Sequence, residues 1–323
     1  MKGNVWKYLL LPVLILLASY LLLFRDRDPF GGRNSNFASK PRKEITGIEL
    51  SDNTGELKLT RKEDSWILDD GSEVRKSSVF FIIQILSGIE IKSPVSPELF
   101  RAEITDKGIE PVKVRIYENR KLLNSFYVYK TQSNIYGNIM KRKERSKPFI
   151  VHLPGYETNI GSVFTVNDLY WKPFTVFNLL PSEITSVKFE NLVDTSSSFV
   201  IRNIDGRFVL SNRDSELSGW DTSRIIRYLS YFAYIPFESW EFEMEPSEME
   251  NLKSSDPLYI ISVTSTTGGN IRLVMWERIL SAGGEKKKDT DRLWAMTDSD
   301  AGIFIIRYMD IDPLLKKRSY FFP

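Results

Sequence analysis

The sequence predicts an α+β protein made of two copies of one βββαββββ unit, each an antiparallel sheet with one packed helix, after an N-terminal transmembrane helix. Three observations predict this fold. The order of apolar segments in residues 45–154 recurs in residues 184–313. Each copy contains one apolar stripe with helical spacing. An uncharged segment long enough to approach the thickness of a bilayer lies near the beginning of the chain.

The duplication can be followed along the printed sequence. Residues 45–50 match 184–189, and residues 66–68 match 208–210. In the helix, Val79, Ile82, Ile83 and Leu86 match Ile225, Tyr228, Leu229 and Phe232. The same spacing places Val114 opposite Ile260 in the alignment, and insertions fall only in turn-like stretches. The alternative is a chance alignment of two α+β segments.

Each copy opens with three strands, whose alternating apolar residues predict an antiparallel meander. These strands are expected at 45–50, 57–60 and 65–68, and again at 184–190, 199–202 and 207–210. A helix follows, beginning near Ser72 in the first copy and Asp221 in the second, since both are N-cap residue types. Four more strands close each copy, at 112–117, 125–130, 134–140 and 149–153, and at 258–264, 271–278, 292–297 and 302–308.

The first 28 residues predict a membrane anchor, because the run from Tyr8 to Phe24 carries no charge. A cleavable signal peptide is the alternative, but Arg25 and Asp26 follow the run where a small-residue cleavage site would lie. Residues 29–44 predict a flexible stalk. Lysines and arginines occur on both sides of the run, so charge alone does not orient it, yet large domains translocate largely regardless of charge. We expect a single-pass protein of the inner (cytoplasmic) membrane with its globular part in the periplasm.

Composition excludes several classes of function. The 44 basic and 42 acidic residues nearly cancel, so no overall field favours nucleic acid. The chain has no cysteine and a single histidine, His152, which excludes the usual zinc constellations and leaves triad chemistry dependent on one residue. It contains no phosphate-binding glycine motif. We therefore expect no cofactor, no metal and no catalytic residues.

The segment between the copies, residues 155–183, is too aromatic for a solvated linker. We expect a packed helical bridge that holds the copies together, with Trp171 and Phe174 buried. The alternative is that Trp171 and Phe174 form a patch that binds a partner. Residues 314–323 are expected to form a C-terminal tail.

Two charged segments are further candidates for an interaction surface. Residues 238–250 alternate acidic and apolar side chains, which predicts a half-buried strand presenting Glu241, Glu243 and Glu245 on one face. A strand spaces these carboxylates too widely for a cation site, so metal binding is the weaker reading. Lys141, Arg142 and Lys143 begin a basic cluster at an expected hairpin tip. Such a cluster is solvated by default, and its functional reading is contact with anionic lipid or an acidic partner.

The order of these elements resembles a known bacterial family. Asp106-Lys-Gly108-Ile-Glu-Pro111 leads into a strand, and Asp168-Leu-Tyr-Trp-Lys172 precedes Leu180-Pro-Ser-Glu-Ile184. Both segments are similar to motifs of the family called domain of unknown function 4340, although Pro111 comes one place early and the second motif is degenerate. The resemblance covers most of residues 45–310. It implies a membrane-anchored envelope protein, in a family with some members beside transport or surface-motility components, and it supplies no catalytic residues.

Together these observations predict a non-enzymatic single-pass membrane protein whose extracytoplasmic domain binds or scaffolds another envelope protein, as an accessory to envelope transport or surface machinery. The alternative is an envelope hydrolase with paired carboxylates, which would need two acidic side chains facing one cleft.

Overall fold

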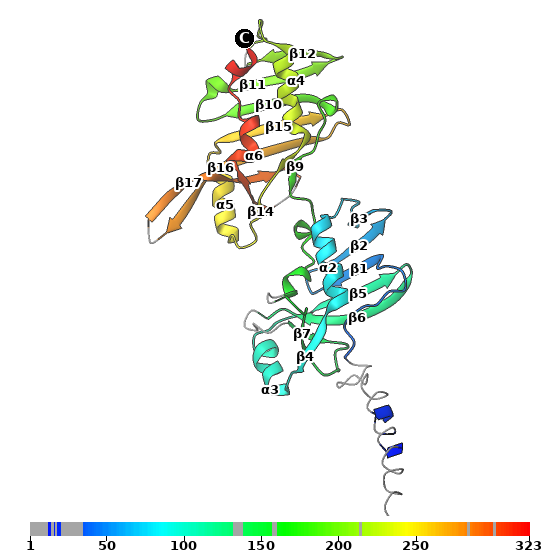
Figure 1. The fold of residues 1–323 in the computed structure, drawn as a ribbon. Coiled ribbons are helices and arrows are strands. Elements are labelled where there is room, and N and C mark those ends of the chain that lie inside the picture. Colours follow the sequence, from blue (N-terminus) through cyan, green and yellow to red (C-terminus); the bar gives the residue numbers. More distant parts are fainter. Residues whose placement is uncertain are drawn as a thin grey trace, which may run out of the picture. The chain divides into compact units, whose positions relative to one another are not determined.

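The computed structural model describes residues 35–131, 138–156, 160–212, 215–282, 285–299 and 302–323, and in the N-terminal segment residues 12, 13, 16 and 18–20. The chain divides into two compact units at Lys172 and Pro173 (Figure 1). Each unit contains one eight-stranded antiparallel sheet, so the mixed α+β class is confirmed.

The strands of the first unit are β1 (Gly47–Ser51), β2 (Glu56–Lys62), β3 (Ser65–Ile67), β4 (Glu90–Pro94), β5 (Val112–Glu118), β6 (Lys121–Tyr129), β7 (Asn138–Lys141) and β8 (Phe149–His152). They lie in the order β3-β2-β1-β5-β6-β7-β8-β4. The chain makes a meander, crosses the sheet through a helix, adds β4 at the far edge and fills the space between with β5 to β8.

The second unit repeats this path. Its strands are β10 (Ile184–Asn191), β11 (Phe199–Ile204), β12 (Arg207–Ser211), β14 (Ser239–Trp240), β15 (Tyr259–Ser265), β16 (Asn270–Ala282), β17 (Glu285–Thr297) and β18 (Phe304–Arg307). Their order, β12-β11-β10-β15-β16-β17-β18-β14, matches the first sheet strand for strand. The prediction of one topology written twice is therefore confirmed. A two-stranded sheet, β9 (Thr175–Phe177) with β13 (Ile235–Pro236), is added in this unit.

One helix packs on the main core face of each sheet (Figure 1): α2 (Lys76–Gly88) in the first unit and α4 (Thr222–Ser230) in the second. The buried side of α2 carries apolar residues at helical spacing, among them Val79, Ile82 and Leu86. Asp221 caps α4 as expected, because its carboxylate accepts the Ser223 N–H at 2.7 Å. The predicted cap at Ser72 is wrong. Its hydroxyl is bonded to Asp70 in a turn, and α2 begins at Lys76.

The predicted βββαββββ unit lacks one strand and one helical segment. β4 and β14 each add an edge strand, and a short helical segment follows: α3 (Pro97–Phe100) with a π-turn at Arg101–Thr105, or α5 (Pro246–Ser254). These segments cover part of the second sheet face through small apolar clusters. Neither edge strand shows buried alternation, since β4 is half-exposed throughout and β14 has two residues, so periodicity could not reveal them.

The sequence alignment of the two copies is one residue out of register in the fifth strand. Leu50 pairs with Val114 in the first sheet, and its counterpart Phe189 pairs with Ile261, not Ile260. Because side chains alternate along a strand, this slip moves Ile260 to the other face. There it packs with Val274 and Trp276 beneath α5, away from α4.

The predicted flexible stalk and the predicted C-terminal tail each contribute to a core. Phe37, in the expected stalk, is 2% exposed and packs edge-on against Phe126, so residues 35–39 are part of the first unit. Phe321, in the expected C-terminal tail, is fully buried between Phe199 and Tyr228. The stalk residues around Phe37 are polar, whereas Phe321 is one of three consecutive aromatic residues at the end of the chain. In both segments only the tertiary fold shows which ring is buried.

The aromatic bridge is not one helical element. Residues up to Trp171 join the core of the first unit, while Phe174 stacks on Phe237 and Phe177 lies in β9 of the second. The helices of this segment are single turns, at Ile160–Val163, Asp168–Tyr170 and Pro181–Glu183. Other short helices among the described residues are Thr195–Ser197, Tyr231–Ala233, α6 (Tyr308–Ile311), Asp312–Leu314 and Arg318–Phe321.

The predicted membrane anchor, Tyr8 to Phe24, lies outside the described residues except at six positions. Pro12, Val13, Leu16 and residues 18–20 are helical. Within the described part of the chain, no helix has both the length and the apolar character needed to cross a membrane.

Candidate binding surfaces

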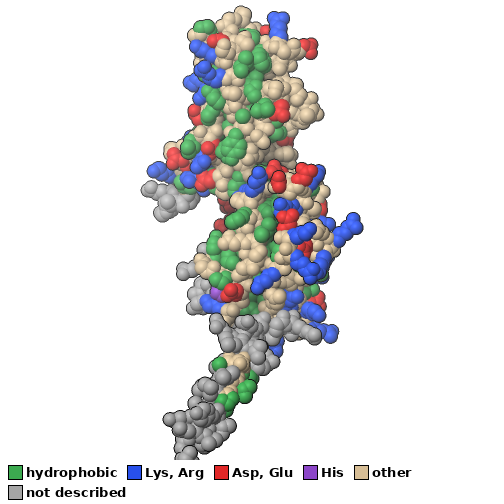
Figure 2. Space-filling view, turned by 45° about the vertical axis from the view of Figure 1, so that its right-hand side comes forward, with side chains coloured by type: hydrophobic (Ala, Val, Ile, Leu, Met, Phe, Trp, Pro, Cys, Tyr) green, Lys and Arg blue, Asp and Glu red, His purple; other side chains and the backbone are tan. Residues whose placement is uncertain are grey.

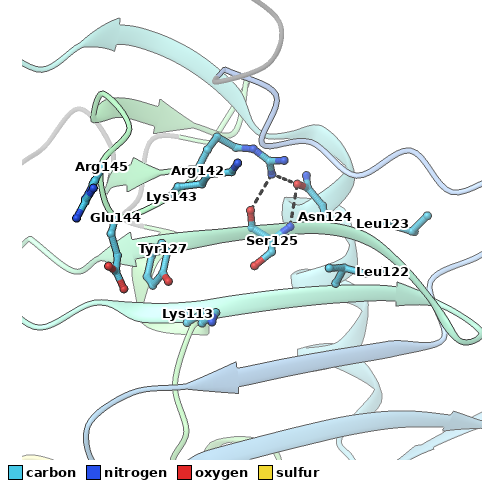
Figure 3. Close-up of a pocket in the computed structure, with 10 residues that line it drawn as sticks. All are labelled: Lys113, Leu122, Leu123, Asn124, Ser125, Tyr127, Arg142, Lys143, Glu144 and Arg145. Carbon is cyan, nitrogen blue, oxygen red and sulfur yellow. Dashed lines mark hydrogen bonds between the residues drawn. The ribbon is translucent and has the colours of Figure 1, made fainter.

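The basic cluster lies where the sequence places it, in the turn between β7 and β8. The side chains of the three predicted residues, Lys141, Arg142 and Lys143, have different surroundings. The Lys141 ammonium sits 4.0 Å above the Phe100 ring, and burial lowers the pKa of Lys141. Lys143 is exposed. Arg142 reaches back over β6, so the cluster divides into an apolar-facing lysine and a cationic rim (Figure 3).

Arg142 borders an open groove of about 680 Å³ on the sheet of the first unit. The lining residues are Lys113, Leu122, Leu123, Asn124, Ser125, Tyr127, Arg142, Lys143, Glu144 and Arg145 (Figure 3). The Arg142 guanidinium donates to the Ser125 carbonyl at 2.8 Å and to the Asn124 side-chain oxygen. Asn124 is buried and donates its own N–H to the Phe37 carbonyl at 2.8 Å, which fixes its amide. Burial lowers the pKa of Arg142.

The groove is rich in positive charge. Four of its side chains are cations and one, Glu144, is a carboxylate. Lys113 extends along the Tyr127 ring, 5.8 Å from its centroid. Figure 2 shows lysine and arginine side chains gathered on one side of the first unit. Sequence reasoning missed Lys113, Asn124 and Tyr127. Lys113 and Tyr127 pair across β5 and β6, so strand alternation could have indicated their shared face, but Asn124 lies on the opposite side of β6.

A second groove on the same unit, of about 490 Å³, is lined by three cations, Lys58, Arg61 and Arg120, and one carboxylate, Glu49. Glu49 contacts Arg115 at 3.0 Å and Lys58 at 3.8 Å, and accepts the Tyr117 hydroxyl at 2.7 Å. Burial, followed by this hydrogen bond, raises the pKa of Tyr117. In this groove the carboxylate of Glu49 is held by two cations and a hydroxyl, so these side chains form a fixed polar network.

The acidic segment does not form the predicted half-buried strand. Only Ser239 and Trp240 pair, with β18, and Glu245 directly precedes α5. Trp240 is buried but Phe242 is 51% exposed, so the expected apolar face is not continuous. Pro246 explains the difference, because proline is favoured at the first turn of a helix and disfavoured within a sheet. Glu241 and Glu243 remain a loop pair, and no group of metal-ligand residues is found among the described residues.

Trp171 and Phe174 do not form an exposed patch. Trp171 is fully buried and its indole N–H donates to the Thr165 carbonyl at 3.0 Å. Phe174 is half-buried and stacks on Phe237 with ring centroids 5.0 Å apart. The prediction of burial is confirmed for Trp171, and the partner-patch alternative is wrong for it.

The hairpin of β16 and β17 is a surface that the sequence did not indicate. Its outer part extends beyond the neighbouring strands, since β15 pairs with β16 only as far as Met275 and β18 pairs with β17 only from Arg292. In Figure 1 this part stands clear of the second unit as a two-stranded arm. Ile279 and Leu280 on the arm are 53% and 39% exposed. We call residues 276–291 the hairpin arm.

An ion pair secures the base of the hairpin arm at a bulge. The register shifts between Glu277 and Ile279, and Arg278 there pairs with the buried Asp289. The Arg278 guanidinium also lies 4.7 Å from the Trp294 ring centre. Asp289 accepts the backbone N–H groups of Asp291 and Arg292 at 3.0 and 3.2 Å.

We expect Asp289→Asn to destabilise the second unit by about 1–3 kcal/mol at neutral pH, through loss of charged hydrogen bonds. Burial alone would raise the pKa of Asp289, but the Asp291 N–H and Arg278 outweigh it and lower the pKa below its ordinary 3.8. A depressed pKa stabilises the fold above 3.8, and this contribution disappears as the pH falls through the folded pKa. The difference in thermal unfolding between parent and variant should therefore be constant from neutral pH to about pH 4 and close below it. A difference that persists in stronger acid contradicts the ionic explanation.

The three grooves lack the carboxylate pair that the hydrolase alternative requires. The third groove, of about 430 Å³, contains Glu118, and each of the three grooves has one carboxylate. His152 lies half-buried on β8 opposite Glu90, outside all three. Neither a carboxylate pair nor a nucleophile with a base lies in these grooves.

No protein-family model, no curated protein and no solved structure matches the chain.

Proposed function

We propose that the chain is a non-enzymatic, single-pass membrane protein whose extracytoplasmic units bind another envelope protein, as an accessory to envelope transport or surface machinery. The observation that carries the binding role is the hairpin arm. Beyond Met275 and Arg292 its two strands pair only with each other among the described residues, so their outer backbone groups can pair with another chain.

The two edges of the arm differ in chemistry. The β17 edge carries Lys287 and Lys288, and edge lysines discourage strand pairing. The β16 edge carries Ile279 and Leu280, whose exposed apolar side chains favour contact. A partner strand would therefore add to β16.

The membrane part of the proposal rests on the uncharged run from Tyr8 to Phe24 and on the exposed apolar side chains of Val13 and Leu16 in its helical residues. The resemblance to domain of unknown function 4340 supports the same reading. The carboxylate hydrolase is the weaker alternative, because each groove contains a single carboxylate.

Topology is tested with a reporter fused after Pro323. We expect it to read as extracytoplasmic, because large domains follow an uncleaved anchor across the membrane. N-terminal sequencing should find Met1 or Lys2. A mature chain that starts between Phe24 and Lys43 would show that the run is a cleaved signal peptide.

The binding role is tested by placing a photo-crosslinking residue at Leu280 in the full chain in native membranes. The control is Val193, an apolar position outside the arm that is more exposed than Leu280, at 71% against 39%. We expect one discrete crosslinked product from Leu280 and none from Val193. Ile279→Lys should abolish that product if β16 is the contact edge. Equal crosslinking from both positions would contradict the proposal that the hairpin arm is the binding surface.

A further inference from the structure

In the described part of the chain, the guanidinium of Arg142 has neutral hydrogen-bond partners and no carboxylate partner. Its guanidinium donates to an amide oxygen and a carbonyl, those of Asn124 and Ser125, while it is half-buried. A charge withdrawn from water without a counter-charge is costly. An anion in the groove beside Arg142 would provide that counter-charge.

Three more cations share this groove without a carboxylate partner among the described residues: Lys113, Lys143 and Arg145. Two cations of the second groove are paired, Arg61 with Glu44 and Lys58 with Glu49. The third groove has the same excess of positive charge as the groove of Arg142, since Arg42, Lys43, Arg120 and Lys121 line it with Glu118. What distinguishes the groove of Arg142 is a half-buried guanidinium held by the neutral oxygens of Asn124 and Ser125.

The second unit supplies an internal comparison. In the first sheet, Lys113 pairs with Tyr127 and Tyr127 with Lys141. These three residues form a row across neighbouring strands. The equivalent row in the second sheet consists of Ile260, Val274 and Met296, packed beneath Leu252 of α5. The fold therefore accepts an apolar, covered row at this place.

The residues that follow the row differ in charge as well. Arg142 and Lys143 come directly after Lys141, whereas Thr297 and Asp298 come directly after Met296. At these positions the two copies therefore differ in polarity and in charge, so the cations of the groove are not needed to form the sheet.

We propose that this groove binds a phosphate monoester, with Arg142 as the fixed contact and the neighbouring lysines and Arg145 as surrounding cations. Such a group carries about 1.5 to 2 negative charges and three acceptor oxygens, which fits a groove with three positive charges in excess. A carboxylate has one charge and two oxygens. The volume of about 680 Å³ lies in the range of small-molecule sites.

The phosphate can come from a lipid headgroup or from a soluble compound, because the groove is open to solvent. The inference goes beyond the proposed function, since it requires neither a protein partner nor the hairpin arm.

The test uses the full chain purified in a neutral detergent and titrated with three probes. Glycerol 3-phosphate and short-chain phosphatidic acid present the same phosphate monoester without and with acyl chains, and succinate is the carboxylate comparison. We expect saturable binding of both phosphate probes, weakened by salt because the groove is exposed. Tighter binding of the lipid probe assigns the site to a headgroup, and equal binding assigns it to a soluble phosphate. Succinate binding as tight as either would overturn the phosphate assignment.

Two variants locate the site. Arg142→Gln should weaken phosphate binding about 10- to 100-fold, the effect of losing a charged hydrogen bond. The double variant Lys143→Gln with Arg145→Gln alters exposed side chains only and should weaken binding about tenfold, so a folding defect at Arg142 does not decide the result. The matched control is Lys58→Gln with Arg61→Gln, which removes two paired cations and should bind as the parent does. Parental affinity in the double variant, or equal weakening in the control, would overturn the proposal.

Discussion

Replacing Trp171 by alanine is expected to lower the free energy of unfolding of the first unit by about 3–5 kcal/mol. The indole is fully buried in the main core and donates its N–H to the Thr165 carbonyl, so truncation leaves both a cavity and an unpaired carbonyl. The backbone carbonyl of Trp171 also accepts the Arg75 N–H at 2.7 Å, just before α2. Denaturant unfolding of the full chain measures the effect. A typical domain has only about 5–15 kcal/mol of stability, so the first unit should become marginal.

The matched control is Phe80→Ala. Phe80 lies on α2 and is 72% exposed, so the same loss of an aromatic ring should change stability by at most about 0.5 kcal/mol. If Trp171→Ala unfolds like the parent, the side chain does not contribute to the core and the exposed-patch interpretation returns.

A loss of similar size is expected for Phe321→Ala in the second unit, again about 3–5 kcal/mol. The ring is fully buried and meets Phe199 at a centroid distance of 4.7 Å and Tyr228 at 5.3 Å. The Phe321 carbonyl accepts the Asp221 N–H at 2.8 Å, at the cap of α4. Phe321→Ala should therefore lower the unfolding temperature and increase proteolysis at the end of the chain.

Met309→Ala is the comparison for Phe321→Ala, because Met309 lies close by in sequence and is 73% exposed. It should unfold as the parent does. If Phe321→Ala also unfolds as the parent does, residues 318–323 are a tail, as the sequence suggests, and do not form part of the core.

Part of the candidate site could be predicted from the sequence. The position of Lys141, Arg142 and Lys143 at a hairpin turn follows from the strand pattern on either side. Their separation into one lysine against Phe100 and one arginine over Ser125 does not, because both partners lie far away in the chain. The hairpin arm was missed for a related reason: strand length relative to its neighbours is a property of the sheet.

Local pattern alone determined the duplicated order of strands and helix, since alternation and the apolar stripe are written into each segment. It also indicated the cap at Asp221. The tertiary structure decided what depends on distant partners: the edge positions of β4 and β14, the register that turns Ile260 away from α4, and the burial of Phe37 and Phe321. These features lower the free energy of the folded state through contacts between residues far apart in sequence. Local periodicity does not predict such contacts.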